Sequence, residues 1–139
     1  MRILFICKHN RFRSKVAEAY FKKLNKDKRI QIVSAGVFKG NPISNNVISI
    51  GKKLGINITH KTQGLKSKGM NRIDLLVIVA DDVPKSLFKG KIKDIRVWKI
   101  NDTSETNTKR IEKTMKEIFK KVDILIKELK ESKKWTQIK

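Results

Sequence analysis

The chain has 139 residues, of which 39% are hydrophobic and 34% are charged, and its formal net charge is +21. This length predicts one folded domain, residues 1–139, with a sizeable core, and no apolar run is long enough to span a bilayer, so no membrane partner is expected. The single cysteine excludes an internal disulfide and favours a reducing cytoplasm. One cysteine and two histidines also leave no complete set of metal ligands, so we expect no metal and no cofactor.

Hydrophobic patterning predicts strands that alternate with helices along the chain. The predicted strands cover residues 2–6, 30–34, 74–80 and 95–100, with a short extended piece at 56–59. The predicted helices cover residues 14–26, 44–54, 84–88 and 106–131, followed by a loose tail over about 132–139. This order predicts an α/β fold: a single doubly wound domain with a four-stranded, mostly parallel sheet and helices on both faces.

Reactive and polar side chains stand at the carboxyl ends of the predicted strands. Cys7, Ser34, Asp81 and Asp102 each lie at or just past such an end. Ligands of parallel α/β sheets bind at this edge. The sequence therefore predicts a site there.

The segment Cys7-Lys8-His9-Asn10-Arg11-Phe12-Arg13-Ser14 lies between the first predicted strand and the first predicted helix. The backbone N–H groups of such a loop and the N-terminus of the helix carry partial positive charge and can hold a tetrahedral oxyanion. The same field stabilises a cysteine thiolate, which is a nucleophile. An arginine at position 13 supplies a planar fork for two oxygens, and Ser14 can cap the helix or reach the thiolate. This spacing predicts a nucleophile, an anion cradle and a charge clamp in eight residues.

The net charge of +21 favours anionic partners such as phosphorylated substrates, nucleic acid or acidic membrane surfaces. The lysines are spread along the whole chain, as on a solvated surface, and aromatic residues are not interleaved with them. We therefore expect nucleic acid to bind only through non-specific charge.

The loop resembles the active site of the low-molecular-weight protein tyrosine phosphatases, and equally that of the arsenate reductases that share their fold. The similarity continues through Ser34-Ala35-Gly36, residues 55–61, the strand into Asp81 and an aspartate before the last helix. The family aspartate usually precedes proline, whereas Asp102 is followed by Thr103, and many members carry a second cysteine where this chain has Phe12.

The resemblance implies a two-step displacement. Cys7 attacks phosphorus to form a phosphocysteine, which water then hydrolyses, and Asp102 protonates the leaving group and later activates water. Arg13 and the backbone amides of the loop bind the phosphoryl oxygens. The other loop residues implied to bind substrate are Lys8, His9, Asn10, Arg11, Phe12 and Ser14.

Three further residues are implied to support this site. Ser34 and His60 match family positions that hydrogen-bond with Asn10 and keep the loop in shape. Asp81 is expected to orient the Arg13 side of the pocket.

The sequence thus predicts a cytoplasmic, metal-independent phosphatase that hydrolyses phosphotyrosine or other aryl phosphate monoesters. Its partners would be a phosphorylated protein or a small phosphate ester, with inorganic phosphate or arsenate as ligand. Two alternatives stay open. An arsenate reductase with Cys7 as its sole cysteine would need an external thiol, and a degenerate site would give a non-catalytic protein that binds oxyanions or nucleic acid.

Overall fold

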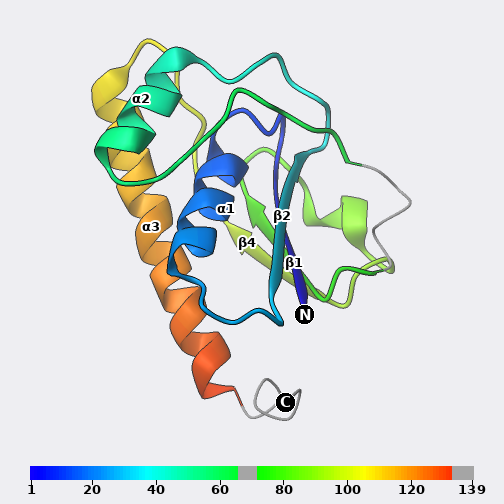
Figure 1. Ribbon diagram of the computed structural model, residues 1–139. Coiled ribbons are helices and arrows are strands. Elements are labelled where there is room, and N and C mark those ends of the chain that lie inside the picture. Colours follow the sequence, from blue (N-terminus) through cyan, green and yellow to red (C-terminus); the bar gives the residue numbers. More distant parts are fainter. Residues whose placement is uncertain (66–71, 133–139) are drawn as a thin grey trace.

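A computed structural model describes residues 1–65 and 72–132. Four parallel strands form one sheet in the order β2-β1-β3-β4 (Figure 1). The strands are β1 (Arg2–Cys7), β2 (Gln31–Gly36), β3 (Leu75–Val79) and β4 (Asp94–Trp98). The helices are α1 (Arg13–Leu24), α2 (Asn45–Lys53), α3 (Thr108–Glu131) and the 3₁₀ helix η2 (Lys85–Phe88). The predicted α/β fold with a four-stranded parallel sheet is confirmed.

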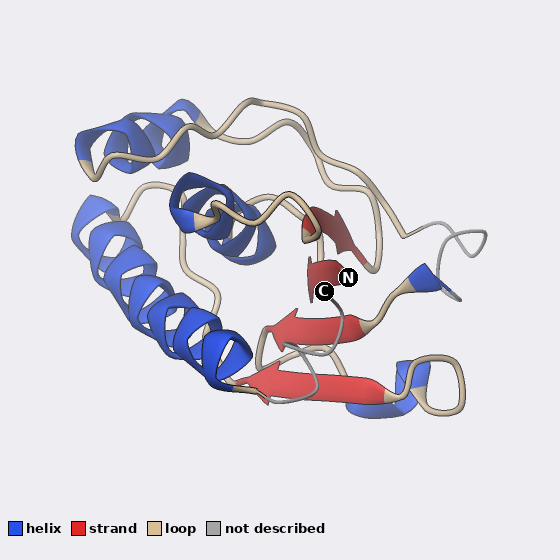
Figure 2. Cartoon of the chain, turned by 60° about the horizontal axis from the view of Figure 1, so that its bottom comes forward, coloured by secondary structure: helices blue, strands red, loops and turns tan. Residues whose placement is uncertain are grey.

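The two faces of the sheet are covered unequally. Alternate side chains such as Phe5 and Val77 pack with the apolar faces of α1, α2 and α3 in one core. Leu4 and Leu76, one position away on the same strands, pack with the segment 80–92 that includes η2. Figure 2 shows the three long helices on one side of the sheet and the short helical turn on the other. Because both faces are covered, every residue of β3 is buried, as its unbroken apolar run predicts.

Most element boundaries lie within a few residues of those predicted. The extended piece expected at 56–59 pairs with no described strand; instead Gly64 forms an isolated parallel bridge with Gly36, the last residue of β2. The helix at 84–88 is a 3₁₀ helix, and α3 begins later than expected because Asn107 caps it by accepting a hydrogen bond from the Arg110 N–H. The tail expected to be loose falls almost entirely on residues 133–139, outside the described residues.

The order of the strands determines where a ligand can bind. The chain passes from β1 to β2 in one direction across the sheet and from β3 to β4 in the other. The carboxyl ends of β1 and β3 therefore flank the topological switch point, where α/β sheets leave a crevice. No helix within residues 1–65 and 72–132 combines the length and apolar character needed to cross a membrane.

Candidate active site

The loop after β1, which we call the anion loop (residues 7–14), is held by its carbonyl groups. The carbonyls of Cys7, Lys8 and His9 accept hydrogen bonds of 3.0, 3.0 and 3.1 Å from the N–H groups of residues 37, 38 and 40. Within residues 1–65 and 72–132, the N–H groups of residues 8–12 donate no hydrogen bond. The loop thus turns its carbonyls toward the chain after β2 and leaves its amides, with the N-terminus of α1, free to bind an oxyanion.

Gly36 allows the anion loop to lie this close. A Cβ atom at position 36 would be 2.6 Å from the carbonyl carbon of His9 and 2.7 Å from the backbone nitrogen of Asn10. Any side chain there would push the loop away from the end of β2. This close approach explains the glycine in the Ser34-Ala35-Gly36 segment.

Asn10 shapes the anion loop from within. It is fully buried and has a φ of 58°, in the left-handed region that asparagine tolerates better than most residues. Its amide nitrogen donates to Ser14 Oγ at 2.8 Å and to Ser34 Oγ at 3.0 Å. Its amide oxygen accepts from the Gln63 N–H at 3.0 Å. The side chain therefore ties the loop to α1, β2 and the segment after residue 60.

A chain of hydrogen bonds runs from Glu18 on α1 to the nucleophile. The Ser34 hydroxyl donates to the Glu18 carboxylate at 2.6 Å, so its oxygen can only accept from Asn10. Ser14 also accepts from Asn10, and its hydroxyl lies 3.0 Å from Cys7 Sγ. Asn10 thus donates toward both ends of the chain. A thiolate at Cys7 would have no hydrogen of its own, so Ser14 would then be the donor and would stabilise it.

Arg13 is buried, with 2% of its side chain exposed, and its guanidinium group faces the ends of β3 and β4. Nη1 donates to the Ile100 carbonyl at 2.9 Å and lies 3.3 Å from Asp81 Oδ1. Nη2 lies 3.0 Å from Asp82 and 3.9 Å from Asp102. A buried charge is tolerated because these carboxylates and the carbonyl compensate it.

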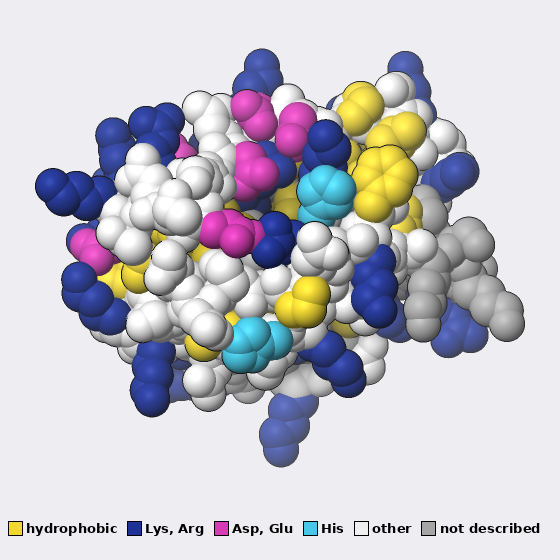
Figure 3. All heavy atoms as spheres, turned by 90° about the horizontal axis from the view of Figure 1, so that it is seen from above, with side chains coloured by type: hydrophobic (Ala, Val, Ile, Leu, Met, Phe, Trp, Pro, Cys, Tyr) yellow, Lys and Arg dark blue, Asp and Glu magenta, His cyan; other side chains and the backbone are white. Residues whose placement is uncertain are grey.

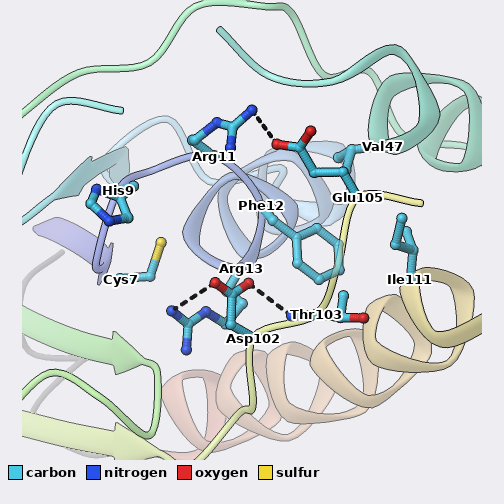
Figure 4. Close-up of a pocket in the computed structure, with 10 residues that line it drawn as sticks. All are labelled: Cys7, His9, Arg11, Phe12, Arg13, Val47, Asp102, Thr103, Glu105 and Ile111. Atoms are coloured by element: carbon cyan, nitrogen blue, oxygen red, sulfur yellow. Dashed lines mark hydrogen bonds and ion pairs between the residues drawn. The ribbon is translucent and has the colours of Figure 1, made fainter. Parts of the chain in front are cut away.

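A cavity of about 70 Å³ lies over the anion loop (Figure 4). Cys7 is at its floor, and Asp102, which is 57% exposed, comes from the loop after β4, here called the acid loop (residues 101–106). The Thr103 N–H donates to Asp102 Oδ1 at 2.9 Å. The residues that line the cavity are Cys7, His9, Arg11, Phe12, Arg13, Val47, Asp102, Thr103, Glu105 and Ile111.

Acidic side chains gather around the cavity even though the chain as a whole is strongly basic. Figure 3 shows Asp and Glu side chains grouped around the hollow, with Lys and Arg around the edge of this face. Asp81, Asp82, Asp102 and Glu105 are the carboxylates that pair here with Arg11 or Arg13.

The structure brings most of the residues predicted from the sequence together. Cys7, Arg13 and Asp102 line one cavity, Asp81 contacts Arg13 as expected, and Ser34 contacts Asn10. Lys8 is exposed and its side chain is not among those lining the cavity.

The position expected of His60 is wrong. Its Nε2 is 2.8 Å from Asn45 Oδ1, at the start of α2, and none of its described contacts reaches Asn10 or Ser34. Gln63 takes that place, because the chain around residue 64 pairs with Gly36 and brings the Gln63 N–H beside Asn10. The Gln63 side chain also donates to the Ser34 carbonyl at 2.8 Å.

Sequence reasoning also missed two acidic residues. Glu18 lies one helical turn after Ser14, an i,i+4 spacing that could have drawn attention to it. Glu105 pairs with Arg11 across the mouth of the cavity. These two residues lie far apart in the sequence, so no local spacing predicts their contact.

Comparison with known proteins places the chain in a family. The family model described as low molecular weight phosphotyrosine protein phosphatase matches residues 2–135. A search of curated proteins gives no match. Three similar solved structures follow, all with the same fold.

The low molecular weight protein tyrosine phosphatase from T. tengcongensis is 29% identical, with a TM-score of 0.75, over 92% of this chain and 99% of its own. An arsenate reductase from Archaeoglobus fulgidus is 24% identical, with a TM-score of 0.71, over 89% and 98%. The YwlE arginine phosphatase from Geobacillus stearothermophilus is 21% identical, with a TM-score of 0.74, over 94% and 97%. Because the family model covers nearly the whole sequence, the chain belongs to the low molecular weight phosphotyrosine protein phosphatase family.

Proposed function

We propose that the protein is a metal-independent phosphatase that hydrolyses phosphotyrosine or other aryl phosphate monoesters through a phosphocysteine. The observation that carries this proposal is that Cys7 Sγ lies 3.0 Å from the Ser14 hydroxyl in the anion loop, whose N–H groups at residues 8–12 donate no hydrogen bond to any described residue. A thiolate there faces the phosphorus of any phosphoryl group bound by those amides. The single cysteine is in keeping with a cytoplasmic protein.

The reaction has two displacements. In the first, Cys7 Sγ bonds to phosphorus while the bond from phosphorus to the leaving oxygen breaks, and the Asp102 carboxylic acid gives that oxygen its proton. In the second, water attacks phosphorus, gives a proton to the Asp102 carboxylate and displaces the Cys7 thiolate. Inorganic phosphate is released and the thiolate and the acid are restored.

Arg13 would stabilise the charge that spreads over the phosphoryl oxygens. Its Nη1 stays on the Ile100 carbonyl, while Nη2 exchanges the nearby carboxylates for an oxygen of the substrate. The fork of the guanidinium allows both contacts at once, because its N–H donors point in several fixed directions.

The aryl group has an apolar surface to lie against. His9 lines the cavity, and the ring of Phe38 lies next to it, with ring centroids 6.1 Å apart. Phe38 is not itself among the lining residues, but it is 58% exposed, so an aryl group that extends past His9 would reach it.

The carboxylates around the cavity favour a second candidate substrate. When the bond between nitrogen and phosphorus in a phosphorylated arginine breaks, the leaving guanidine takes up a proton and becomes a cation. The carboxylates of Asp81, Asp82 and Glu105 would attract this cation. The Geobacillus stearothermophilus structure, which has the same fold, is an arginine phosphatase. Arsenate reduction is the remaining alternative, and Cys7 would then need an external thiol.

The test is hydrolysis of p-nitrophenyl phosphate, phosphotyrosine and phosphoarginine in the presence of chelator, with arsenate plus thiol in parallel. Chelator-resistant turnover that Cys7→Ser lowers by roughly 10⁴-fold or more supports the phosphocysteine route. A preference for phosphoarginine would transfer the assignment to the second candidate. Thiol-dependent arsenite release without aryl phosphate turnover would replace it by a reductase, and phosphate binding without any turnover by a binding protein.

A further inference from the structure

The acid loop is anchored to the rest of the protein at few points. Among the described residues, the contact between Asp102 and Arg13 is long, at 3.9 Å, and the loop's other polar contacts outside its own neighbourhood come from Glu105. The Glu105 side chain pairs with Arg11, and its carbonyl accepts from Asn46 Nδ2 at 2.8 Å. Figure 4 shows the Arg11–Glu105 pair bridging the anion loop and the acid loop across the cavity.

Contacts other than the pair with Glu105 also hold the Arg11 side chain. Its Nε donates to the Asn41 carbonyl and its Nη2 to the Pro42 carbonyl, both at 3.1 Å. Its side chain also lies against Gly40, where a Cβ atom would be 2.6 Å from Arg11 Cγ. The guanidinium group is therefore a fixed point on the anion-loop side, and Glu105 closes onto it.

This arrangement matters because the sequence has no proline to stiffen the acid loop. Asp102 is followed by Thr103, whose N–H bonds back to the Asp102 carboxylate. That bond sets the local turn but connects the loop to nothing else. Fixing the loop over the anion loop is left to Glu105, three residues farther along.

We propose that the Arg11–Glu105 ion pair is a positioning device that holds Asp102 at the leaving group of the substrate. The proposal rests on the function proposed above, in which Asp102 is the general acid. Arg11 and Glu105 are positioning residues: they act through the placement of Asp102, and they contribute most when proton transfer limits the reaction.

Glu105→Gln keeps the shape of the side chain and removes its charge. A misplaced acid slows substrates with poor leaving groups, which need the proton, and spares those with good ones. We expect kcat/KM, which reports only the first displacement, to fall about 10-fold for phenyl phosphate and by less than about twofold for p-nitrophenyl phosphate. Arg11→Lys, which loses the fork, should give the same selective loss.

Glu128→Gln is the matched control. It removes the ion pair between Glu128 and Arg96, whose exposed fractions of 50% and 35% are close to the 45% and 32% of Glu105 and Arg11. This control should leave both substrates unchanged. An equal loss of kcat/KM in Glu105→Gln for both substrates would overturn the proposal, because it would indicate a contact with the phosphoryl group or a general disturbance.

The double variant separates this inference from the proposed function. If Glu105 acts through Asp102, then Glu105→Gln should cause no further loss in an Asp102→Asn background. A further loss of the same size would overturn the positioning role and leave Asp102 as the acid. If Asp102→Asn alone keeps the wild-type dependence on leaving group, the acid itself is misassigned, and this role of Glu105 falls with it.

Discussion

The two loops that meet at the cavity are built in opposite ways. In the anion loop, Asn10 and Ser14 are fully buried, and Asn10 makes hydrogen bonds to three different segments. In the acid loop, Asp102 is 57% exposed, and Glu105 is the main tie to the rest of the protein. Groups that stabilise transition-state charge must be fixed in advance, since reorienting them costs free energy during the reaction. Asp102, the proposed proton donor, is fixed less firmly, by contacts at the surface.

The largest expected effect comes from the charge clamp of the anion loop. Arg13→Lys should lower kcat/KM for p-nitrophenyl phosphate by about 10²–10³-fold, because an ammonium group cannot hold the Ile100 carbonyl and a phosphoryl oxygen in the fixed geometry of the guanidinium fork. Steady-state kinetics on this substrate measure the loss. Arg96→Lys, at the Glu128 pair, is the control and should be close to wild type. A fully active Arg13→Lys would show that backbone amides suffice for the anion.

Asn10 tests how strongly the anion loop is determined. Asn10→Ala removes the side chain that donates to Ser14 and Ser34 and accepts from the Gln63 N–H, and it places an alanine at a φ of 58°. We expect the free energy of unfolding to fall by about 3 kcal/mol, from the lost buried hydrogen bonds and the backbone strain together.

Asn10→Gly is the matched variant for that experiment, since glycine adopts this φ without strain. It should be about 1 kcal/mol more stable than Asn10→Ala in urea unfolding. Equal stabilities would mean that the left-handed backbone at position 10 costs nothing.

Glu18→Gln tests whether the orientation of the Ser34 hydroxyl, which Glu18 fixes, affects Cys7. A glutamine side chain can donate as well as accept, so the Ser34 hydroxyl is no longer forced to point at position 18. We expect kcat/KM to fall by roughly threefold to tenfold and Cys7 to be alkylated more slowly by iodoacetamide at neutral pH. Glu117→Gln, on the exposed side of α3, should change neither rate. A lower kcat/KM with unchanged alkylation would assign Glu18 to folding rather than to the thiolate.

The sequence is most informative where the site is local. The segment from Cys7 to Ser14 connects a parallel strand directly to its helix. The thiol, the loop amides and the Arg13 guanidinium group are therefore expected together at the carboxyl end of the strand, where ligands of α/β sheets bind. The apolar run of β3 and the order of strands and helices likewise predict the sheet, since burial on both faces leaves no polar alternation.

Contacts between distant segments could not be predicted in this way. His60 was expected beside Asn10 from the order of residues, but the bridge between Gly36 and Gly64 brings Gln63 there instead. Arg11 was expected in the anion site and does line the cavity, but its pairing with the Asn41 and Pro42 carbonyls and with Glu105 was not predicted. Such contacts depend on the paths of loops, and loops have no periodic pattern of apolar residues from which a path could be predicted.

The smallest expected effect concerns the support of the acid loop and its dependence on pH. Helix α2 carries Asn46, which bonds to the Glu105 carbonyl, and α2 is linked to α3 by Lys53 and Glu112, 2.8 Å apart. Hydrogen bonds from Lys53 and then from Lys116 lower the pKa of Glu112. A carboxyl group with a lowered folded-state pKa stabilises the fold above its unfolded pKa, roughly 4.3, and loses this contribution as the pH falls through the folded value.

Glu112→Gln should therefore lower Tm slightly at pH 7, and the Tm values of variant and wild type should converge near pH 3. Thermal unfolding at both pH values measures the difference, and a constant gap between the two proteins would contradict it. Because α2 also holds the Glu105 carbonyl through Asn46, acid should weaken the α2–α3 link that supports the acid loop.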